Sequence, residues 1–296
     1  MEKTIKIGVI ANTDKPLAKS TLGEIAKKAQ TRGFTILAEE STISLASCSG
    51  PWQASKLQDM ADARVVIVLG GDGTLLRAVH SLSGVEVPVM GLNIGSLGYL
   101  SGVGSNEIEM AFDAISADAL EVSNRQMLSA TINRKDGSVE HIERDALNEM
   151  VLSRGSGRMV RISMELDGVP VMTYACDGLI ASTPTGSTAY SLSAGGPLVM
   201  PGTAATVITV ICPHALASRP IVVSDNTKIT LRPTQGETPL ILTIDGEELA
   251  TLSCGDTLDI RKSNRCAKIA FPPQHNNYQV LSRKLGWTGT CLPNCK

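Results

Sequence analysis

The sequence predicts an α/β fold followed by a β-rich one: a doubly wound, mainly parallel α/β domain over residues 1–122 and a β-rich domain over residues 123–270. Three observations predict this. The chain has 296 residues, which is longer than a domain with a single hydrophobic core usually is. Strand and helix patterns alternate up to about residue 120, as in parallel sheets. From Arg125 onward, short alternating stretches meet at Asp-Gly turns, as in antiparallel sheets.

The elements follow in order from the spacing of apolar residues. Residues 5–10 alternate as a first strand, and helix-period residues from Leu17 to Arg32, closed by Gly33, predict a helix. The remaining N-terminal pattern predicts strands over residues 34–38, 65–69 and 87–92, a helix directly after Gly73 and another over 105–117. In the second domain we expect strands over 128–134, 160–166, 240–244 and 258–260.

Composition excludes several classes of partner. The net charge is −2 and no basic cluster appears, which argues against nucleic acid and anionic membranes and favours a small ligand. Asp14 and Lys15 interrupt the first apolar stretch too early for a signal peptide. The longest apolar stretch, residues 204–212, is far shorter than the ~18 residues of a membrane span. We therefore expect a cytoplasmic protein with no membrane segment.

Cysteines and histidines are dispersed. The seven cysteines do not form a secreted disulfide pattern, so free thiols are expected. Only Cys291 and Cys295 lie close together, and this pair lacks the two further ligands of a zinc site. The four histidines show no Ser-His-Asp order that would support a hydrolase. No metal site built from the chain's own residues is predicted.

The most informative motif is Gly70–Thr74, which follows the apolar strand 65–69 and precedes a helix. Glycines let the backbone turn sharply and approach a ligand, and the helix N-terminus offers unpaired N–H groups to an anion. This predicts a phosphate site at the carboxyl end of a strand. Asp72 adds a negative charge there, which suggests that it accepts a proton or holds a metal rather than binding the anion.

Two familiar phosphate motifs do not match. A Walker loop needs Lys after its last glycine, where this chain continues Thr74-Leu75, and a dinucleotide fingerprint needs glycine at position 76, which is Leu. A tight strand-to-helix turn capped by Asp72 remains an alternative.

Three further segments combine small and polar residues. Residues 91–100 follow the next strand, so Tyr99 is expected either to stack on a base or to fill the core. Asn148-Glu149 suits the vicinal hydroxyls of a ribose, or simply begins a strand. Residues 177–197 interleave eight hydroxyl residues with four glycines and two prolines, which suits reading of a nucleobase and sugar, or a long Ser/Thr turn.

Taken together, Gly70–Thr74, Asn148-Glu149, the segment Thr183–Pro197 and the ending Lys284–Trp287 resemble the NAD kinase family in order and spacing. The Gly-Gly-Asp-Gly motif alone is shared with lipid kinases and phosphofructokinases, whereas the Ser/Thr/Gly segment is specific. The resemblance implies a C-terminal tail, about 271–296, that returns to the first domain. It also implies a homo-oligomer, usually a tetramer or else a dimer, with active sites at subunit and domain contacts.

The resemblance also implies roles for single residues. Asp72 resembles the general base that deprotonates the adenosine ribose 2′-hydroxyl of NAD, and Asn148 and Glu149 resemble the residues that hold the nucleotide's sugar and base. The further binding positions that it implies are Gly71, Gly73 and Thr74 at the phosphates and Asp177, Thr188, Ala189, Tyr190, Ser191, Leu192 and Ser193 along the dinucleotide.

Other positions keep two interpretations. Arg77 and Arg158 resemble cations near phosphate, although exposed arginines are common. Asp245 matches a second acidic position, although the hairpin turn Asp245-Gly246 explains it equally well. Ala175 stands where some relatives carry Arg, which leaves discrimination between NAD and NADH open.

The expected activity is transfer of a phosphoryl group from ATP to NAD, giving ADP and NADP, with Mg²⁺ accompanying the triphosphate. Absence of a nucleophile beside the glycine turn favours direct in-line transfer. A lipid or sphingoid-base kinase and a non-catalytic dinucleotide-sensing module are the alternatives. The first would need an apolar acceptor cleft, and the second leaves Asp72 without a purpose. The donor, ATP or polyphosphate, stays open.

Overall fold

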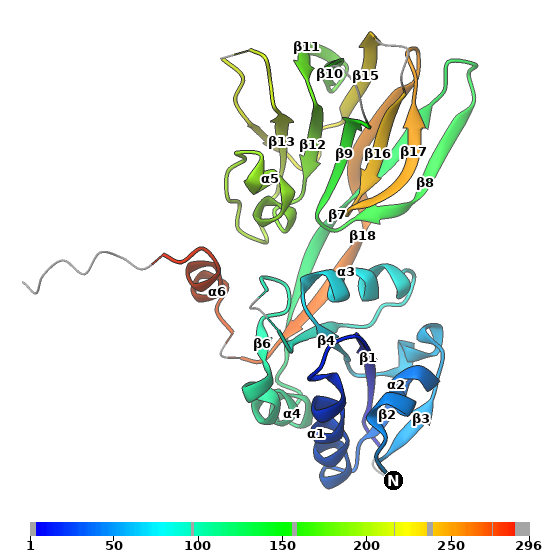
Figure 1. The fold of residues 1–296 in the computed structure, drawn as a ribbon, viewed down its shortest axis with the longest axis vertical. Coiled ribbons are helices and arrows are strands. Elements are labelled where there is room, and N and C mark those ends of the chain that lie inside the picture. The colour runs from blue at the N-terminus through cyan, green and yellow to red at the C-terminus, as the bar shows by residue number, and fades with distance from the viewer. Residues whose placement is uncertain are drawn as a thin grey trace, which may run out of the picture. The chain divides into compact units, whose positions relative to one another are not determined.

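A computed structural model describes residues 4–95, 98–155, 159–215, 217–235, 239–273 and 275–287 (Figure 1). The chain forms two compact units. One joins the residues up to Ser123 with those from Lys268 onward, and the other is Asn124–Ala267. The chain therefore leaves the first unit, builds the second, and returns to complete the first.

The first unit is built on a parallel sheet with the strand order β18-β5-β4-β1-β2-β3, with β6 also paired to β5. Its strands are β1 (Lys6–Ala11), β2 (Thr35–Ala38), β3 (Trp52–Ala54), β4 (Val66–Gly70), β5 (Val89–Asn93), β6 (Val103–Gly104) and the end of β18 (Thr257–Phe271). Its helices are α1 (Ala18–Thr31), α2 (Glu40–Ala46), α3 (Asp72–Ser81), α4 (Ile108–Ser116) and α6 (Asn277–Lys284).

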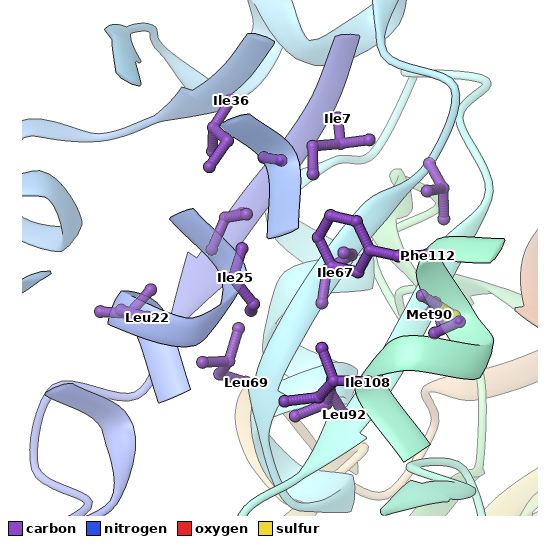
Figure 2. Close-up of a cluster of buried hydrophobic side chains, with 14 of the residues drawn as sticks. Ile7, Leu22, Ile25, Ile36, Ile67, Leu69, Met90, Leu92, Ile108 and Phe112 are labelled. Carbon is purple, nitrogen blue, oxygen red and sulfur yellow. The ribbon is translucent and has the colours of Figure 1, made fainter. Parts of the chain in front are cut away.

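Both faces of this sheet are covered. Alternate strand residues such as Ile7, Ile67 and Met90 pack with α1 and α4 in one buried cluster (Figure 2). Within this cluster, Phe112 stacks on Phe34. On the opposite face, a Cβ added to Gly91 would lie 2.6 Å from Leu75 of α3, so α3 packs closely on β5. This arrangement is the predicted doubly wound fold.

Several short elements of the first unit were missing from the prediction. They are α2, β3, β6, α6 and a 3-10 helix at Leu57–Asp62. Each has few residues, so its apolar spacing does not stand out in a sequence window. No helix within the described ranges is long and apolar enough to cross a membrane.

The second unit is a β-sandwich. One sheet has the antiparallel order β14-β13-β12-β9-β16-β17. These strands are β14 (Ile221–Ser224), β13 (Ala205–Ile211), β12 (Gly178–Ser182), β9 (Glu149–Arg154), β16 (Leu240–Ile244) and β17 (Glu247–Leu252). The other sheet contains β11 (Val169–Cys176), β10 (Val160–Leu166), β15 (Ile229–Gln235), the start of β18, β7 (Glu121–Asn133) and β8 (Val139–Ala146). The two sheets share one apolar cluster that includes Leu152, Ile162, Leu179 and Leu242.

The Asp-Gly turns predicted from the sequence close the hairpins. Asp167 and Gly168 have φ of 51° and 80°, and Asp245 and Gly246 have 50° and 83°. Two successive positive φ angles are those of the tight hairpin turn that favours Asp-Gly. The fold class expected from the sequence is therefore confirmed in both parts.

Candidate functional site

In the first unit, the candidate site is centred on the carboxylate of Asp72. Strand β4 ends at Gly70, the extended Gly71 is the N-cap, and α3 begins at Asp72 itself. Oδ2 of Asp72 accepts the N–H of Tyr99 at 2.7 Å. Oδ1 accepts the N–H groups of Leu100 and Ser101, each at 3.0 Å, and the Ser101 hydroxyl at 2.9 Å. The carboxylate thus fixes the backbone that follows β5.

The charge of Asp72 is stabilised by these contacts. Burial works to raise the pKa of the Asp72 carboxyl, but the N–H groups of Ser101 and Tyr99 and the positive charge of Lys284 together hold the pKa below its usual value. Nζ of Lys284 lies 3.5 Å from Oδ2. Asp72 is therefore ionised at neutral pH.

The glycines around Asp72 are accommodated for different reasons: two of them leave no room for a side chain, and two face open space. A Cβ on Gly70 would lie 2.3 Å from Oγ1 of Thr74, and one on Gly98 would lie 2.0 Å from Oδ1 of Asp72. Side chains at these two positions would collide with the motif. A Cβ on Gly71 or Gly73 would meet nothing within 4 Å. Open space at the start of α3 leaves room for an anion to approach the backbone N–H groups.

A cavity of about 240 Å³ lies beside the motif. Its lining includes Asn12, Thr13, Thr74 and Arg77, and Asn12 Nδ2 lies 3.5 Å from Thr74 Oγ1. Sequence reasoning missed Asn12 and Thr13. They follow β1, whose neighbour in the sheet is β4, so both strands end at the same sheet edge. This shared edge could have predicted that Asn12 and Thr13 lie near the glycine turn.

The ring of Tyr99 belongs to the core. Only 1% of Tyr99 is exposed, and its backbone N–H donates to Asp72. This placement favours the core interpretation of Tyr99 over base stacking, because a buried ring offers no open face to a base.

In the second unit, the carboxylate of Asp245 holds the Asn148-Glu149 pair. Asp245 accepts the N–H groups of Leu147 and Asn148 at 2.8 Å and of Glu149 at 3.0 Å. Asp245 also occupies the predicted hairpin turn. These three hydrogen bonds give Asp245 a structural role, since they fix the backbone from which Asn148 and Glu149 project.

Glu149 is a buried acid. It is 7% exposed, and Oε2 has no hydrogen-bond partner among the residues that the structure describes. Burial raises the pKa of Glu149 to about 8, and the charge of Asp245 adds to the rise, while the N–H of Tyr190 opposes it. Glu149 is therefore neutral at neutral pH, and its carboxyl group can donate a hydrogen bond.

Much of the Ser/Thr-rich segment is used internally. The Thr183 hydroxyl donates to the Leu147 carbonyl at 2.6 Å, and Ser187 donates to the Pro184 carbonyl at 2.7 Å. Ser191 is fully buried and pairs with Thr209 at 2.8 Å. These internal hydrogen bonds favour the interpretation of a long Ser/Thr turn for the buried members.

A smaller exposed part of this segment remains available. Tyr190 is 45% exposed and begins the short helix α5 (Tyr190–Ser193). The partly or fully exposed positions around it are Thr188, Ala189, Leu192 and Ser193. A Cβ on Gly186 would lie 2.1 Å from the Asn148 carbonyl oxygen, so the segment packs directly against the Asn148 backbone.

Asp177 and Ala175 lie away from this group. Glu149 pairs with Ser182 at one end of β12, whereas Gly178 pairs with Ser153 at the other. The two ends are four residue steps apart along the strand, which is about 13 Å. Asp177 is paired with Arg154, Nε to Oδ1 at 2.7 Å, and this hydrogen bond holds the pKa of Asp177 below its usual value.

The remaining predicted positions divide into two groups. Arg77 lines the cavity beside Thr74. Arg158, Cys291 and Cys295 lie outside the described residues. Among the residues that are described, no group of three or more His, Cys, Asp or Glu side chains is placed to hold a metal ion.

The chain thus combines a doubly wound α/β unit, in which an aspartate is fixed in a Gly-Gly-Asp-Gly turn, with a β-rich unit, and family models identify this combination as that of a kinase. Residues 7–120 match the model of the ATP-NAD kinase N-terminal domain, and residues 147–270 match that of the ATP-NAD kinase C-terminal domain. The chain belongs to the ATP-NAD kinase family.

Relatives of similar length support this assignment. The chain is 38% identical to an NAD kinase of Magnetococcus marinus over 289 residues, 96% of this chain and 94% of that protein. It is 35% identical to an NAD kinase of Syntrophotalea carbinolica over 287 residues, 95% of this chain and 98% of that protein.

Solved structures share the fold. A yeast NADH kinase, crystallised with NADH, has a TM-score of 0.88 at 23% identity and covers 99% of this chain and 91% of its own. An NAD kinase from Archaeoglobus fulgidus, in complex with ATP, has a TM-score of 0.74 at 24% identity and covers 96% and 100%.

The close approach of Gly98 to Asp72 gives a first prediction. Gly98→Ala should lower the free energy of unfolding by about 1–3 kcal/mol, because the added methyl group displaces the carboxylate from its N–H donors. Urea denaturation measures this. Gly95→Ala is the matched control, since its Cβ would come no closer than 3.9 Å to its neighbour, Asn93. Equal stability of the two variants would contradict the described packing.

The buried Glu149 gives a second prediction, on pH. Its pKa is about 8 in the folded chain against an ordinary value of 4.5, so between these pH values the folded state holds a proton that the unfolded state has lost. The free energy of unfolding should therefore fall as pH rises through this window. Glu149→Gln, which carries no such proton, should gain in Tm relative to wild type between pH 5 and pH 9.

The matched control for this pH series is Glu248→Gln, at an exposed position of β17. Its Tm should follow the wild-type curve throughout. A constant difference between Glu149→Gln and wild type across the pH series would show that Glu149 is ionised in the folded chain.

Proposed function

We propose that the chain transfers the γ-phosphoryl group of ATP to the adenosine ribose 2′-hydroxyl of NAD, and that Asp72 is the general base. The observation that carries this proposal is the unequal use of the two Asp72 oxygens. Within the described part of the chain, Oδ1 accepts three hydrogen bonds, whereas Oδ2 accepts one, from the N–H of Tyr99. Since a carboxylate oxygen has two lone pairs, Oδ2 keeps one for the substrate hydroxyl.

In this reaction, Oδ2 takes the proton of the 2′-hydroxyl as the ribose oxygen bonds to the γ-phosphorus. An aspartate with a lowered pKa is a weak base, so proton transfer accompanies a late stage of bond formation. The rigid hydrogen bonds from Tyr99, Leu100 and Ser101 support this role because they fix the oxygen before substrate arrives. Most of the rate then comes from positioning and charge stabilisation.

The phosphates are assigned to the start of α3. The open space at Gly71 and Gly73 and the N–H groups of the helix N-terminus suit an anionic chain, and Thr74 and Arg77 line the adjoining cavity. Arg77 supplies a positive charge one turn into the helix. Arg158 stays a proposed phosphate contact from its place in the sequence alone.

We assign Mg²⁺ to the triphosphate. Magnesium is usually held by one or two carboxylates together with substrate phosphates, so a kinase needs no dedicated cluster of acidic side chains. When bound, Mg²⁺ would neutralise charge on the triphosphate. The four hydrogen bonds to Asp72 suit that residue better to proton transfer than to metal binding.

The dinucleotide is assigned to Asn148, Glu149 and the exposed part of the Ser/Thr segment around Tyr190. The neutral carboxyl group of Glu149, with Oε2 unpartnered, supports a hydrogen bond to a sugar or base acceptor. Asp245 supports the same site through the backbone it holds. The family resemblance alone supports a ligand contact for Ser191, Asp177 and Ala175. The contacts described for these residues do not connect them to Asn148, Glu149 or Tyr190.

We further propose a homo-oligomer and a cytoplasmic location. Strand β11 is an edge strand that exposes Val169, Val171 and Met172, at 64%, 46% and 42%, and an apolar edge of this kind favours association with another chain. The described thiols of Cys48, Cys176, Cys212 and Cys266 are in no disulfide, which suits a reducing compartment.

The direct test of the function is incubation of purified protein with ATP, Mg²⁺ and either NAD or diacylglycerol, followed by mass analysis of the products. Asp72→Asn should lower kcat by ~10²–10⁴-fold and leave the KM for NAD nearly unchanged, because Asn cannot take the proton. Its amide nitrogen would face an N–H donor, so a modest loss of stability should accompany the loss of rate.

Ser101→Ala is the control for that loss of stability. It removes one hydrogen bond to Oδ1 and keeps the proton acceptor, so its kcat should fall far less. If Asp72→Asn lowers kcat by less than about tenfold, Asp72 is a turn residue and the proposed mechanism is wrong. A raised Mg²⁺ requirement that excess metal rescues would assign it to the metal instead.

Tyr190 gives a separate prediction. Tyr190→Ala should weaken NAD binding by ~1–3 kcal/mol through loss of a stacking or edge contact, with little change in the KM for ATP. Because Tyr190 is 45% exposed, the Tm should barely move. Tyr278→Ala, at an exposed position of α6, is the control. An unchanged KM for NAD together with a lower Tm would make Tyr190 a packing residue.

A further inference from the structure

The C-terminal helix α6 brings a positive charge to Asp72. Nζ of Lys284, in the last turn of α6, lies 3.5 Å from Oδ2 of Asp72, and 5.9 Å from the centre of the Tyr99 ring. Oδ2 is the oxygen that accepts one hydrogen bond, whereas the other three go to Oδ1. The ammonium group therefore lies next to the oxygen that has a lone pair to spare.

The position of Lys284 is fixed by the structure of its helix. The Asn276 side chain caps α6 by accepting the N–H groups of Tyr278 and Gln279, at 2.9 and 3.2 Å. Val280 and Leu281 are buried in the first unit. The helix is thus anchored at its start and along one face, which directs its last turn.

Both charged side chains are partly shielded. The side chains of Asp72 and Lys284 are each 30% exposed. Partial burial strengthens the attraction relative to a pair in open water, because the surrounding dielectric is lower. Among the described residues, the Asp72 carboxyl also accepts the N–H groups of Tyr99, Leu100 and Ser101 and the hydroxyl of Ser101, all of which are uncharged. Lys284 brings a positive charge to this oxygen.

We propose that Lys284 is a positioning residue for Asp72: its ammonium group holds Oδ2 in place and balances the negative charge of Asp72 while an anionic triphosphate approaches. This inference rests on the proposed function. It makes the C-terminal helix part of the catalytic machinery, although the helix contributes no atom to the reaction.

Lys284 does not change which bonds form and break in the phosphoryl transfer. The ribose oxygen forms a bond to the γ-phosphorus, the bond from that phosphorus to the β–γ bridging oxygen breaks, and the hydroxyl proton moves to Oδ2 of Asp72. Lys284 transfers no atom in this step. Its contribution is electrostatic: without it, a bare carboxylate would face the incoming phosphates, and like charges repel.

The experiment is a double-mutant cycle in kcat. Lys284→Met, Lys284→Arg and Arg283→Met are each made alone and combined with Asp72→Asn, and NADP formation is measured. Arg283 is the matched control, since it is the exposed basic neighbour in the same turn. Lys284→Met should lower kcat by roughly fivefold, with both KM values little changed, and Lys284→Arg should restore most of the rate. Arg283→Met should behave as wild type.

The combination with Asp72→Asn separates positioning from a structural role. If Lys284 acts through Asp72, Lys284→Met should cause no further loss of kcat once Asp72 is Asn. An equal loss in both backgrounds would overturn the proposal, as would a loss that Lys284→Arg does not restore. Urea denaturation of the same set gives a readout independent of activity: the effects of Asp72→Asn and Lys284→Met on unfolding should be non-additive.

Two failures can be told apart. A wild-type protein that forms no NADP from ATP and NAD would overturn the proposed function and this inference with it. A wild-type protein that forms NADP, beside a Lys284→Met variant of equal kcat, would overturn the inference alone.

Discussion

The first unit depends on the hydrogen bonds that converge on the Asp72 carboxylate. Three successive backbone N–H groups, from Tyr99 to Ser101, point at one charged side chain at the start of α3. A backbone that runs irregularly beyond a strand has donors that the sheet cannot pair, and a carboxylate satisfies them strongly because the bonds are charge-assisted. The same carboxylate meets Lys284 of α6. The glycine turn, the segment after β5 and the last helix are thereby joined through a single side chain.

The second unit repeats this device. Asp245 accepts three successive N–H groups, from Leu147 to Glu149, and so holds the chain where it enters β9. The consequence differs because the surroundings differ. Beside Asp72 stands a cation, which favours the charged form, whereas beside Asp245 stands Glu149, a second acid in a buried position. Burial and repulsion keep Glu149 protonated, so the second unit adds a neutral acid that can donate a hydrogen bond beside the carboxylate of Asp245.

In the Ser/Thr-rich segment, most hydroxyl groups stabilise a buried turn and only a few residues are exposed to a ligand. Its density of hydroxyls and glycines was the most specific sequence feature, and it supports the family assignment. Most of these hydroxyls nevertheless close a tight, buried turn through bonds such as Thr183 to Leu147 and Ser191 to Thr209. What such a turn presents outward is Tyr190 and its neighbours. The characteristic sequence of this segment is therefore explained by the requirements of a tight, buried turn as much as by ligand binding.

The sequence by itself determined the order and type of the long elements, the glycine turn at Asp72 and the Asp-Gly hairpins, because each depends on residues that are neighbours in the chain. It also placed Asp72 at the carboxyl end of a strand. Only the tertiary structure decided that Tyr99 is buried, that Asp245 holds the backbone of Asn148, and that Lys284 reaches Oδ2 of Asp72. Burial and charge pairing join residues that are far apart in the sequence, and no local pattern of residue types fixes which of them will meet.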